Sequence, residues 1–208
     1  MSSAAATAER RLAELAEEIR GHRRCGFEPC ETCTNPVPGE GSATADIVFV
    51  GEAPGAQEDR QGRPFVGAAG KLLDELLESI GLSREDVFIT NVLKARPPGN
   101  RDPKPDEIFH SWPWLKEQIE LIRPRVIAPL GRHALECFLP GAKVSQDHGR
   151  AIEQAGWTYV PLYHPAAAFR VRPLRETMFA DVAKLPDVLA TAPEPPPGLT
   201  IEPLGSKR

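Results

Sequence analysis

The residues best suited to chemistry lie in a glycine-rich segment between Gly51 and Gly67, which reads GEAPGAQED and, two residues later, GRPFVG. Glycines let a backbone approach a ligand closely, and the segment also carries the carboxylates of Glu52 and Glu58 and the aromatic ring of Phe65. It has neither the Lys-Ser/Thr pair of a phosphate loop nor a G-x-G-x-x-G helix start, so it does not indicate a nucleotide cofactor. Taken alone, the segment is also compatible with a tight turn and solvated acids.

Two polar residues stand where apolar runs end, Asn91 after residues 87–90 and His164 after residues 157–162. A side-chain amide both donates and accepts hydrogen bonds, and a neutral imidazole has one nitrogen for each purpose. A loop-capping role for Asn91 and a structural role for His164 are the alternatives to ligand binding.

The length and composition limit the class of protein. With 208 residues the chain fits one domain with short appendages, and its four cysteines are too few for a disulfide scaffold. The first ten residues contain no apolar signal core, and apolar runs such as 47–50 are far too short to span a bilayer. We therefore expect a cytoplasmic, monomeric protein with no membrane partner.

The net charge of −4 argues mildly against a nucleic-acid partner, because phosphate binding leaves a basic footprint. Two loops nevertheless carry a local positive charge, one over residues 94–104 and one over residues 164–175. Their basic residues are Lys94, Arg96, Arg101 and Lys104 in the first loop and Arg170, Arg172 and Arg175 in the second.

Strands and helices alternate in the hydrophobic pattern. Short apolar runs predict strands at residues 46–51, 87–92, 126–130 and 157–162, and helical periodicity predicts helices at about 5–20, 72–80, 108–122, 131–138 and 178–189. This order predicts a three-layer α/β/α fold with a central, mostly parallel, doubly wound sheet. Ligands of such folds bind at the carboxyl ends of the strands, where the loops 51–70, 91–105 and 164–175 should meet.

The chain divides into three parts. Residues 1–38 are expected to hold the first helix and a cysteine-bearing loop, and residues 39–190 the main domain. Residues 191–208 form a Pro-rich tail that we expect to be disordered, and Pro186 should lie in or near a kink of the last helix.

Five blocks stand in order at the predicted strand ends: GEAPG from Gly51, RPFVG from Arg63, TNVLK from Thr90, RPPGNR from Arg96 and HP from His164. Together they resemble the family 4 uracil-DNA glycosylases, over about residues 39–187. The resemblance implies the fold of those enzymes and a uracil-containing DNA substrate. It also implies hydrolysis of the N-glycosidic bond to an abasic site in base-excision repair, with no cofactor needed for the chemistry.

The resemblance further implies roles for three residues. Phe65 stacks against the flipped uracil, and Asn91 pairs with uracil N3–H and O4, an edge that cytosine does not present. His164 donates to uracil O2 as negative charge develops there, which stabilises the transition state.

The same segment supplies the remaining site residues. Gly51 and Ala53 are assigned to substrate binding, and Ala53 stands where several other families of these enzymes place a water-activating Asp or Asn. Glu52 and especially Glu58 are then the carboxylates that position or activate water, or balance the cationic sugar. A solvated acid at a helix entry is the alternative for Glu58.

By the same resemblance the two basic loops hold DNA phosphates, and residues 166–169 form a wedge that enters the gap left by the base. An exposed surface charge is the alternative for any single arginine. The residues assigned to DNA binding are Arg96, Arg101, Lys104, Arg170 and Arg172.

The cysteines depart from the family pattern. Family 4 enzymes hold a four-iron, four-sulfur cluster on four cysteines, one in a Lys-Cys-Arg-Pro-Pro segment and one in the following helix. Here those two positions are Ala95 and Ser111, so a four-thiolate site of the family type is not predicted. Cys137 lies far from the others and is expected to be a small buried hydrophobe.

Cys25, Cys30 and Cys33 remain as candidate metal ligands, with His22 or His110 as a fourth. Three thiolates and one imidazole suit a tetrahedral structural zinc site. A relocated iron–sulfur cluster on three thiolates, or free thiols in a reducing cytosol, are the alternatives.

Two other functions are compatible with the same motifs. One is a module that recognises uracil or another lesion in DNA without cutting, which Ala53 and the altered cysteines allow. The other is a glycosylase for hypoxanthine or xanthine, against which Asn91 favours a pyrimidine.

Overall fold

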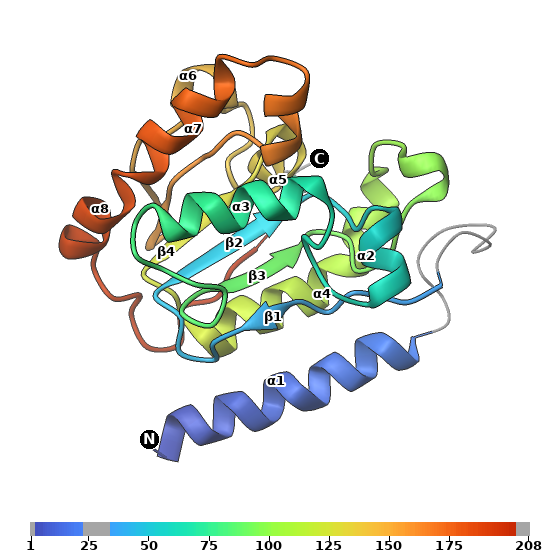
Figure 1. Cartoon of the computed structure of the whole chain (residues 1–208). Coiled ribbons are helices and arrows are strands. Elements are labelled where there is room, and N and C mark those ends of the chain that lie inside the picture. The colour runs from blue at the N-terminus through green and yellow to red at the C-terminus, as the bar shows by residue number, and fades with distance from the viewer. Residues whose placement is uncertain (1–2, 23–33, 203–208) are drawn as a thin grey trace.

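The computed structural model describes residues 3–22 and 34–202 and places a six-stranded sheet between layers of helices (Figure 1). The strand order is β1-β3-β2-β4-β6-β5, with the four inner strands parallel and both edge strands antiparallel. The predicted three-layer α/β/α fold with a mostly parallel sheet is therefore confirmed.

The bounds of the elements are as follows. The strands are β1 (Glu40–Gly41), β2 (Ile47–Gly51), β3 (Phe88–Asn91), β4 (Val126–Pro129), β5 (Ile152–Gln154) and β6 (Trp157–Tyr159). The α-helices are α1 (Ser3–Gly21), α2 (Ala56–Gln61), α3 (Ala68–Glu78), α4 (Pro105–Ile122), α5 (Arg132–Phe138), α6 (Val144–Asp147), α7 (Leu174–Val182) and α8 (Leu185–Thr191). The 3-10 helices are η1 (Pro98–Asn100) and η2 (Pro165–Phe169).

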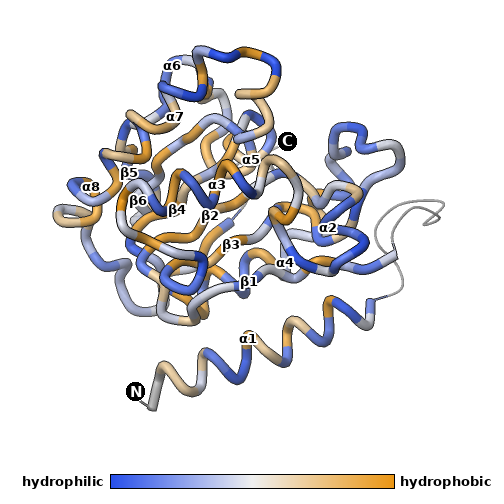
Figure 2. Tube along the Cα trace, viewed as in Figure 1, coloured by the Kyte–Doolittle hydropathy of each residue, from blue (hydrophilic) through white to orange (hydrophobic). Residues whose placement is uncertain are grey.

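Apolar side chains alternate along β2 and bury both faces of the sheet. Val48 and Val50 belong to the core that α4 and α5 cover, whereas Ile47 and Phe49 belong to the core shared with α3, α7 and α8. Figure 2 shows the hydrophobic residues gathered in the strands between these helices. Because both faces are covered, the strand reads as a continuous apolar run in the sequence.

The first helix, α1, packs against α4 and lies outside the two layers that cover the sheet (Figure 1). Leu15 and Ile19 are buried in this contact, and Arg11 Nε donates to Glu117 Oε1 of α4 at 2.6 Å. Neither α1 nor any other helix formed by residues 3–22 and 34–202 combines the length and the apolar character needed to cross a membrane.

Several elements differ from the prediction. The loop 51–70 contains the short helix α2, and the predicted last helix is two helices, because α7 ends at Val182 and α8 begins at Leu185. Pro186 lies in the first turn of α8, where its missing N–H has no intrahelical partner to lose. The edge strands β1 and β5 and the helix α6 escaped prediction because two to four residues are too few to show a hydrophobic period.

Residues 192–202, the part of the Pro-rich tail that the structure describes, pack against the domain. Ile201 is 2% exposed within the core beside α4, and its N–H donates to Glu120 Oε1 at 3.0 Å. Trp157 Nε1 donates to the carbonyl of Thr200 at 3.3 Å. Arg123 also donates to the carbonyls of Pro195 and Pro196, so several contacts hold the described part of a segment whose composition predicts disorder.

Candidate active site

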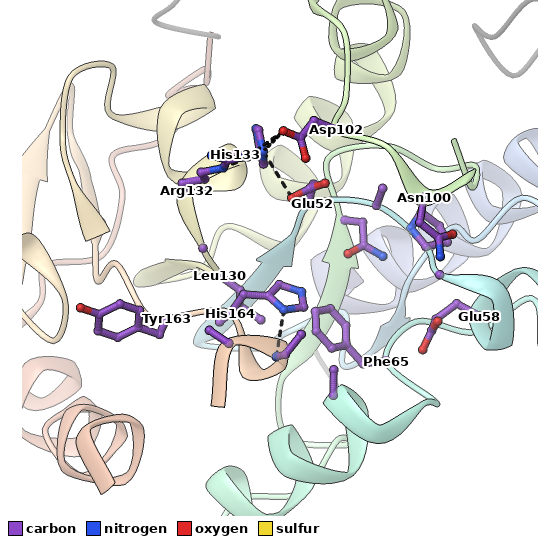
Figure 3. A pocket seen from close by; sticks show the side chains of 18 of the residues that line it. Glu52, Glu58, Phe65, Asn100, Asp102, Leu130, Arg132, His133, Tyr163 and His164 are labelled. Carbon is purple, nitrogen blue, oxygen red and sulfur yellow. Dashed lines mark hydrogen bonds and ion pairs between the residues drawn. The ribbon is translucent and has the colours of Figure 1, made fainter. Parts of the chain in front are cut away.

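A cavity of about 700 Å³ opens where the carboxyl ends of β2, β3 and β4 meet. Its lining brings together Phe65, Asn91 and His164, which come from three separate segments of the chain. Figure 3 shows Phe65 and His164 side by side in this cavity. The other predicted catalytic and substrate-binding residues that line it are Glu52, Ala53 and Glu58. The structure therefore places these side chains in one shared cavity.

Gly51, the last residue of β2, lies directly behind this cavity. A Cβ atom at Gly51 would stand 2.3 Å from Asn91 Oδ1 and 2.6 Å from Phe65 Cζ. Both distances are far below van der Waals contact, so a side chain here would displace the amide, the ring or both. Gly51 therefore contributes to the cavity by leaving room for the Asn91 amide and the Phe65 ring.

The Phe65 loop adopts a backbone conformation that needs support. Phe65 has φ +51°, a left-handed conformation that bulky residues rarely adopt. Arg84 donates to the carbonyl of Pro64 at 3.0 Å and also to the carbonyl of Phe65. A Cβ at Gly70 would come within 1.6 Å of the Phe65 carbonyl oxygen, so only glycine fits at that point.

Arg84 is itself held by two carboxylates, Glu40 and Asp74, each at 2.6 Å. Its side chain is 20% exposed, so the guanidinium is fixed on both sides between the ion pairs and the Phe65 loop. Sequence reasoning did not find Arg84, because nothing in its spacing shows that it reaches back 19 residues to the carbonyl of Phe65.

Glu58 holds the same loop from the other side. Its Oε1 accepts hydrogen bonds from the backbone N–H groups of Val66 and Gly67, both at 2.9 Å. This geometry is that of a loop-positioning carboxylate, and it differs from the solvated acid that was the alternative in the sequence.

His164 lies beside Phe65 in the cavity wall, with ring centroids 5.6 Å apart and planes inclined by 31°. Its Nδ1 accepts the N–H of Ala166 at 3.2 Å, which leaves the proton of the neutral ring on Nε2. Burial lowers the pKa of His164 to about 4, although the charge of Glu58 opposes the shift. At neutral pH the ring is therefore an uncharged hydrogen-bond donor.

Asn91 is 2% exposed at the end of β3. Within residues 3–22 and 34–202 no group makes a hydrogen bond to its side-chain amide, so both amide atoms are available to a ligand. Its backbone carbonyl accepts from Lys94 Nζ at 2.8 Å, and Lys94 also donates to Thr90 Oγ1 and Gln118 Oε1, each at 2.7 Å.

Lys94 does not belong to a basic DNA-facing loop, as the sequence suggested. Its side chain is 1% exposed and has three neutral oxygen atoms around it. Burial lowers the pKa of Lys94 well below its usual value. The residue fastens the end of β3 to α4 and contributes no surface charge.

A cluster of four polar side chains lies across the mouth of the cavity: Glu52, Asp102, Arg132 and His133 (Figure 3). His133 Nε2 is 3.8 Å from Glu52 Oε2 and 3.3 Å from Asp102 Oδ2. Burial raises the pKa of Glu52, and Asp102 raises it further, whereas His133 and Arg132 lower it.

The ligand atoms of Glu52, Asp102 and His133 lie within 4.8 Å of one another, as a metal site would require. Arg132 Nη2 nevertheless holds Asp102 Oδ2 at 2.6 Å and places a positive charge at that point, which disfavours a cation. Sequence reasoning missed Arg132 and His133, since they carry no motif and become relevant only where α5 meets the loop before α4.

The residues assigned to DNA binding have different surroundings. Arg101 forms an ion pair with Glu107, whose side chain is 2% exposed, so Arg101 is committed to the start of α4. Arg96 Nε donates to Asn100 Oδ1 at 2.7 Å. Of these residues Arg101 and Arg170 line the cavity, and Lys104, Arg170 and Arg172 are exposed.

The predicted wedge forms the helix η2, at the rim of the cavity. Ala166 and Ala167 line the cavity, and Phe169 and Val171 are 58% and 49% exposed. Exposed apolar side chains next to a polar cavity are the chemistry expected of an element that enters a base stack.

Cys25, Cys30 and Cys33 lie outside the described residues. Of their predicted partners, His22 Nε2 lies 3.0 Å from His110 Nε2, and His22 shares a small internal cavity with Ala95 and Ser111. Cys137 is buried as expected, and burial raises the pKa of its thiol to about 12.

Comparison with known proteins matches residues 38–184 to the model of the uracil DNA glycosylase superfamily, which is more than half of the chain. The chain belongs to this superfamily. A type-4 uracil-DNA glycosylase of Archaeoglobus fulgidus is 48% identical over 183 residues, covering 84% of this chain and 91% of that protein. The corresponding enzyme of Saccharolobus solfataricus is 43% identical over 189 residues, covering 86% and 87%.

A type-4 enzyme of Thermotoga maritima is 49% identical over 156 residues, covering 73% of this chain and 81% of that protein. The residues that match the superfamily, 38–184, include both sides of the cavity, from Gly51 to His164. The resemblance inferred from the five sequence blocks is confirmed at the level of the family.

Proposed function

We propose that this protein is a monofunctional uracil-DNA glycosylase, which takes uracil out of the DNA stack and hydrolyses its N-glycosidic bond in base-excision repair. The single observation that carries the proposal is the cavity in which Phe65, Asn91 and His164 meet, in a chain 43% to 49% identical to type-4 enzymes. The reaction leaves an abasic site and an intact strand.

Recognition of the base uses the face and the edge of the ring. Uracil stacks on Phe65, an interaction worth about 1–3 kcal/mol for a base on an aromatic ring. The unoccupied amide of Asn91 offers its carbonyl to N3–H and its NH₂ to O4. Cytosine presents the opposite donor and acceptor at these positions, so its entry leaves buried polar groups unpaired.

Departure of the base uses His164. Negative charge grows on uracil O2 as the bond to the sugar breaks. The Nε2–H of the neutral His164 imidazole donates a hydrogen bond to this oxygen and keeps its proton. Loss of one such donor typically slows a reaction by about 10²–10³-fold. His164 thus acts as an electrostatic stabiliser, and its low pKa keeps it in the same protonation state throughout the neutral range.

Water and the cationic sugar involve the two carboxylates. Glu58 uses Oε1 to hold the Phe65 loop, which leaves Oε2 to orient water at the cavity. Glu52 lies at the mouth and balances positive charge on the sugar. Ala53 leaves the position of the usual general base without a functional group.

The exposed cations Lys104, Arg170 and Arg172 hold phosphates of the DNA together with Arg96, whereas Arg101 stays paired with the buried Glu107. The helix η2 presents Phe169 to the gap left by the base. A cytoplasmic location and a monomeric state also belong to this proposal, and light scattering after size exclusion, with and without DNA, tests the latter.

The activity is tested with an end-labelled oligonucleotide that contains one uracil, followed by hot alkali, which breaks the strand at abasic sites. A break at uracil and none at thymine is expected. No break, with the protein shown to be folded by circular dichroism, contradicts the proposal. Tight binding without a break indicates a non-cleaving module, and breaks at hypoxanthine or xanthine indicate another substrate.

A structural metal site is the second part of the proposal. The four-thiolate cluster of family 4 does not fit, because Ala95 and Ser111 stand where two cysteines would be needed. Cys25, Cys30 and Cys33, with His22 or His110 as the fourth ligand, suit a tetrahedral zinc ion, and the Nε2 atoms of the two histidines lie 3.0 Å apart.

Elemental analysis with an absorption spectrum decides the metal. Zinc near one equivalent, lost together with thermal stability in His110→Ala, is expected. Iron with visible absorption indicates a relocated cluster, and metal-free protein of unchanged stability indicates free thiols.

A further inference from the structure

The contact between Asp102 and Arg132 bridges two sides of the cavity mouth (Figure 3). Asp102 belongs to the segment between η1 and α4, and Arg132 begins α5. Arg132 Nη2 lies 2.6 Å from Asp102 Oδ2, and Arg132 Nε donates to His133 Nε2 at 2.9 Å. The His133 imidazole thus orients the Arg132 guanidinium, and the Asp102 carboxylate forms an ion pair with it.

This ion pair is easily exchanged. The side chains of Arg132 and Asp102 are 72% and 63% exposed, and exposed pairs contribute little to stability because water screens them. The neighbouring pair of Arg101 and Glu107 differs, since Glu107 is 2% exposed and also accepts the N–H of Lys104 at 2.8 Å. Arg132 is therefore a cation of this rim whose present anion can be exchanged for another.

Arg132 also stands close to the reacting position. The residue before it, Gly131, has φ +85° and packs so tightly that a Cβ there would lie 2.9 Å from His164 Cβ. A nucleotide whose base reaches His164 has its flanking phosphates one sugar away. Guanidinium groups hold carboxylates and phosphates through the same paired N–H geometry.

We infer that Arg132, oriented by His133, is a binding site for a phosphate next to the flipped nucleotide, and that Asp102 occupies this site as a phosphate mimic in the free protein. The inference rests on the proposed function. Binding DNA then exchanges one anion for another: the Asp102 carboxylate leaves the guanidinium, and a phosphodiester takes its place. Asp102 consequently lowers DNA affinity, and Arg132 raises it.

Affinity is measured by fluorescence anisotropy with a labelled oligonucleotide that carries uracil on a 2′-fluorinated deoxyribose, whose N-glycosidic bond resists hydrolysis. Arg132→Gln should weaken binding and reduce the slope of log K against log salt by about 0.7–0.9, as expected for one lost phosphate contact. Arg10→Gln is the matched control: Arg10 is 74% exposed on α1, outside the cavity lining, and should leave the slope unchanged.

Asp102→Asn should tighten Kd by about two- to fivefold, which is about 0.4–1 kcal/mol. Asp106→Asn removes the same charge from an exposed position four residues on and is the control for general electrostatics. In the Arg132→Gln background the gain from Asp102→Asn should disappear, whereas any effect of Asp106→Asn should persist. Urea unfolding of each variant shows that the fold is retained.

Equal effects of the two aspartate variants, or a gain from Asp102→Asn that survives in Arg132→Gln, would overturn the inference. So would an unchanged salt slope in Arg132→Gln. The proposed function is judged separately, by excision of natural uracil by the unaltered protein with alkali cleavage. Excision with an unchanged slope rejects only the phosphate site, while absence of excision by the folded, unaltered protein rejects the proposed function whatever the slope.

Discussion

Gly51→Ala is a small change that should displace both Phe65 and Asn91, the two residues proposed to recognise the base. The new methyl group would stand 2.3 Å from Asn91 Oδ1 and 2.6 Å from Phe65 Cζ. Ordinary contact requires about 3.4 Å or more, so each group must retreat by about 1 Å, because the β2 backbone between β3 and β4 is fixed by hydrogen bonds. The ring face and the amide edge would no longer fit the same base.

The expected magnitude follows from these displacements. Misplacing reacting groups by about 1 Å can reduce a rate by about 10²-fold, and partial loss of a stacking interaction of about 1–3 kcal/mol gives a similar range. We expect single-turnover excision to fall by about 10- to 100-fold. Overpacking of a buried site typically costs about 1–3 kcal/mol of stability, so the variant should still fold.

Single-turnover excision of uracil and urea unfolding are measured on the same preparations. Gly21→Ala is the matched control, because a Cβ at Gly21 meets nothing within 4 Å. If Gly51 acts through Asn91, the loss from Gly51→Ala should be smaller in an Asn91→Ala background. An excision rate for Gly51→Ala within twofold of the unaltered protein would refute the reasoning, since it would mean that neither side chain needs its observed position.

Three further outcomes are expected. Asn91→Asp replaces the donor for O4 by an acceptor and should lower the ratio of kcat/KM for uracil over cytosine in otherwise identical oligonucleotides; an unchanged ratio would assign discrimination elsewhere. The folded-state pKa of His164, about 4, lies below its ordinary value of 6.5, so the unfolded chain takes up the proton first and stability falls as pH drops from about 6.5 to about 4. His164→Gln should flatten this fall in urea midpoints, and His164→Ala should slow cleavage more than it weakens binding. Arg84→Gln removes charged hydrogen bonds to the Phe65 loop, each worth about 1.5–3 kcal/mol, and should reduce both unfolding free energy and kcat/KM; full activity would show that the loop holds its shape unaided.

The order of the elements and the identity of the cavity residues are largely properties of the sequence. Residues 47–50 form an apolar run because both faces of β2 are covered, and that run ends at Gly51, where the chain turns into the cavity. Asn91 and His164 also stand at the ends of apolar runs, so parallel packing of those strands must bring them to one edge. Local pattern and chain order were enough to predict the fold and the edge of the sheet at which a ligand binds, whereas the roles of Phe65, Asn91 and His164 came from the resemblance of the five blocks to family 4.

The partners of long and charged side chains were decided only by the tertiary structure. Lys94 and Arg101 read alike as basic-loop cations, yet Lys94 is buried against three neutral oxygens and Arg101 pairs with a buried glutamate. The described part of the Pro-rich tail packs against the domain because Ile201 finds a place in a core made by distant residues. Burial and pairing depend on what other segments supply at the same point in space. Hydrophobic periodicity records only which way a residue faces within its own helix or strand.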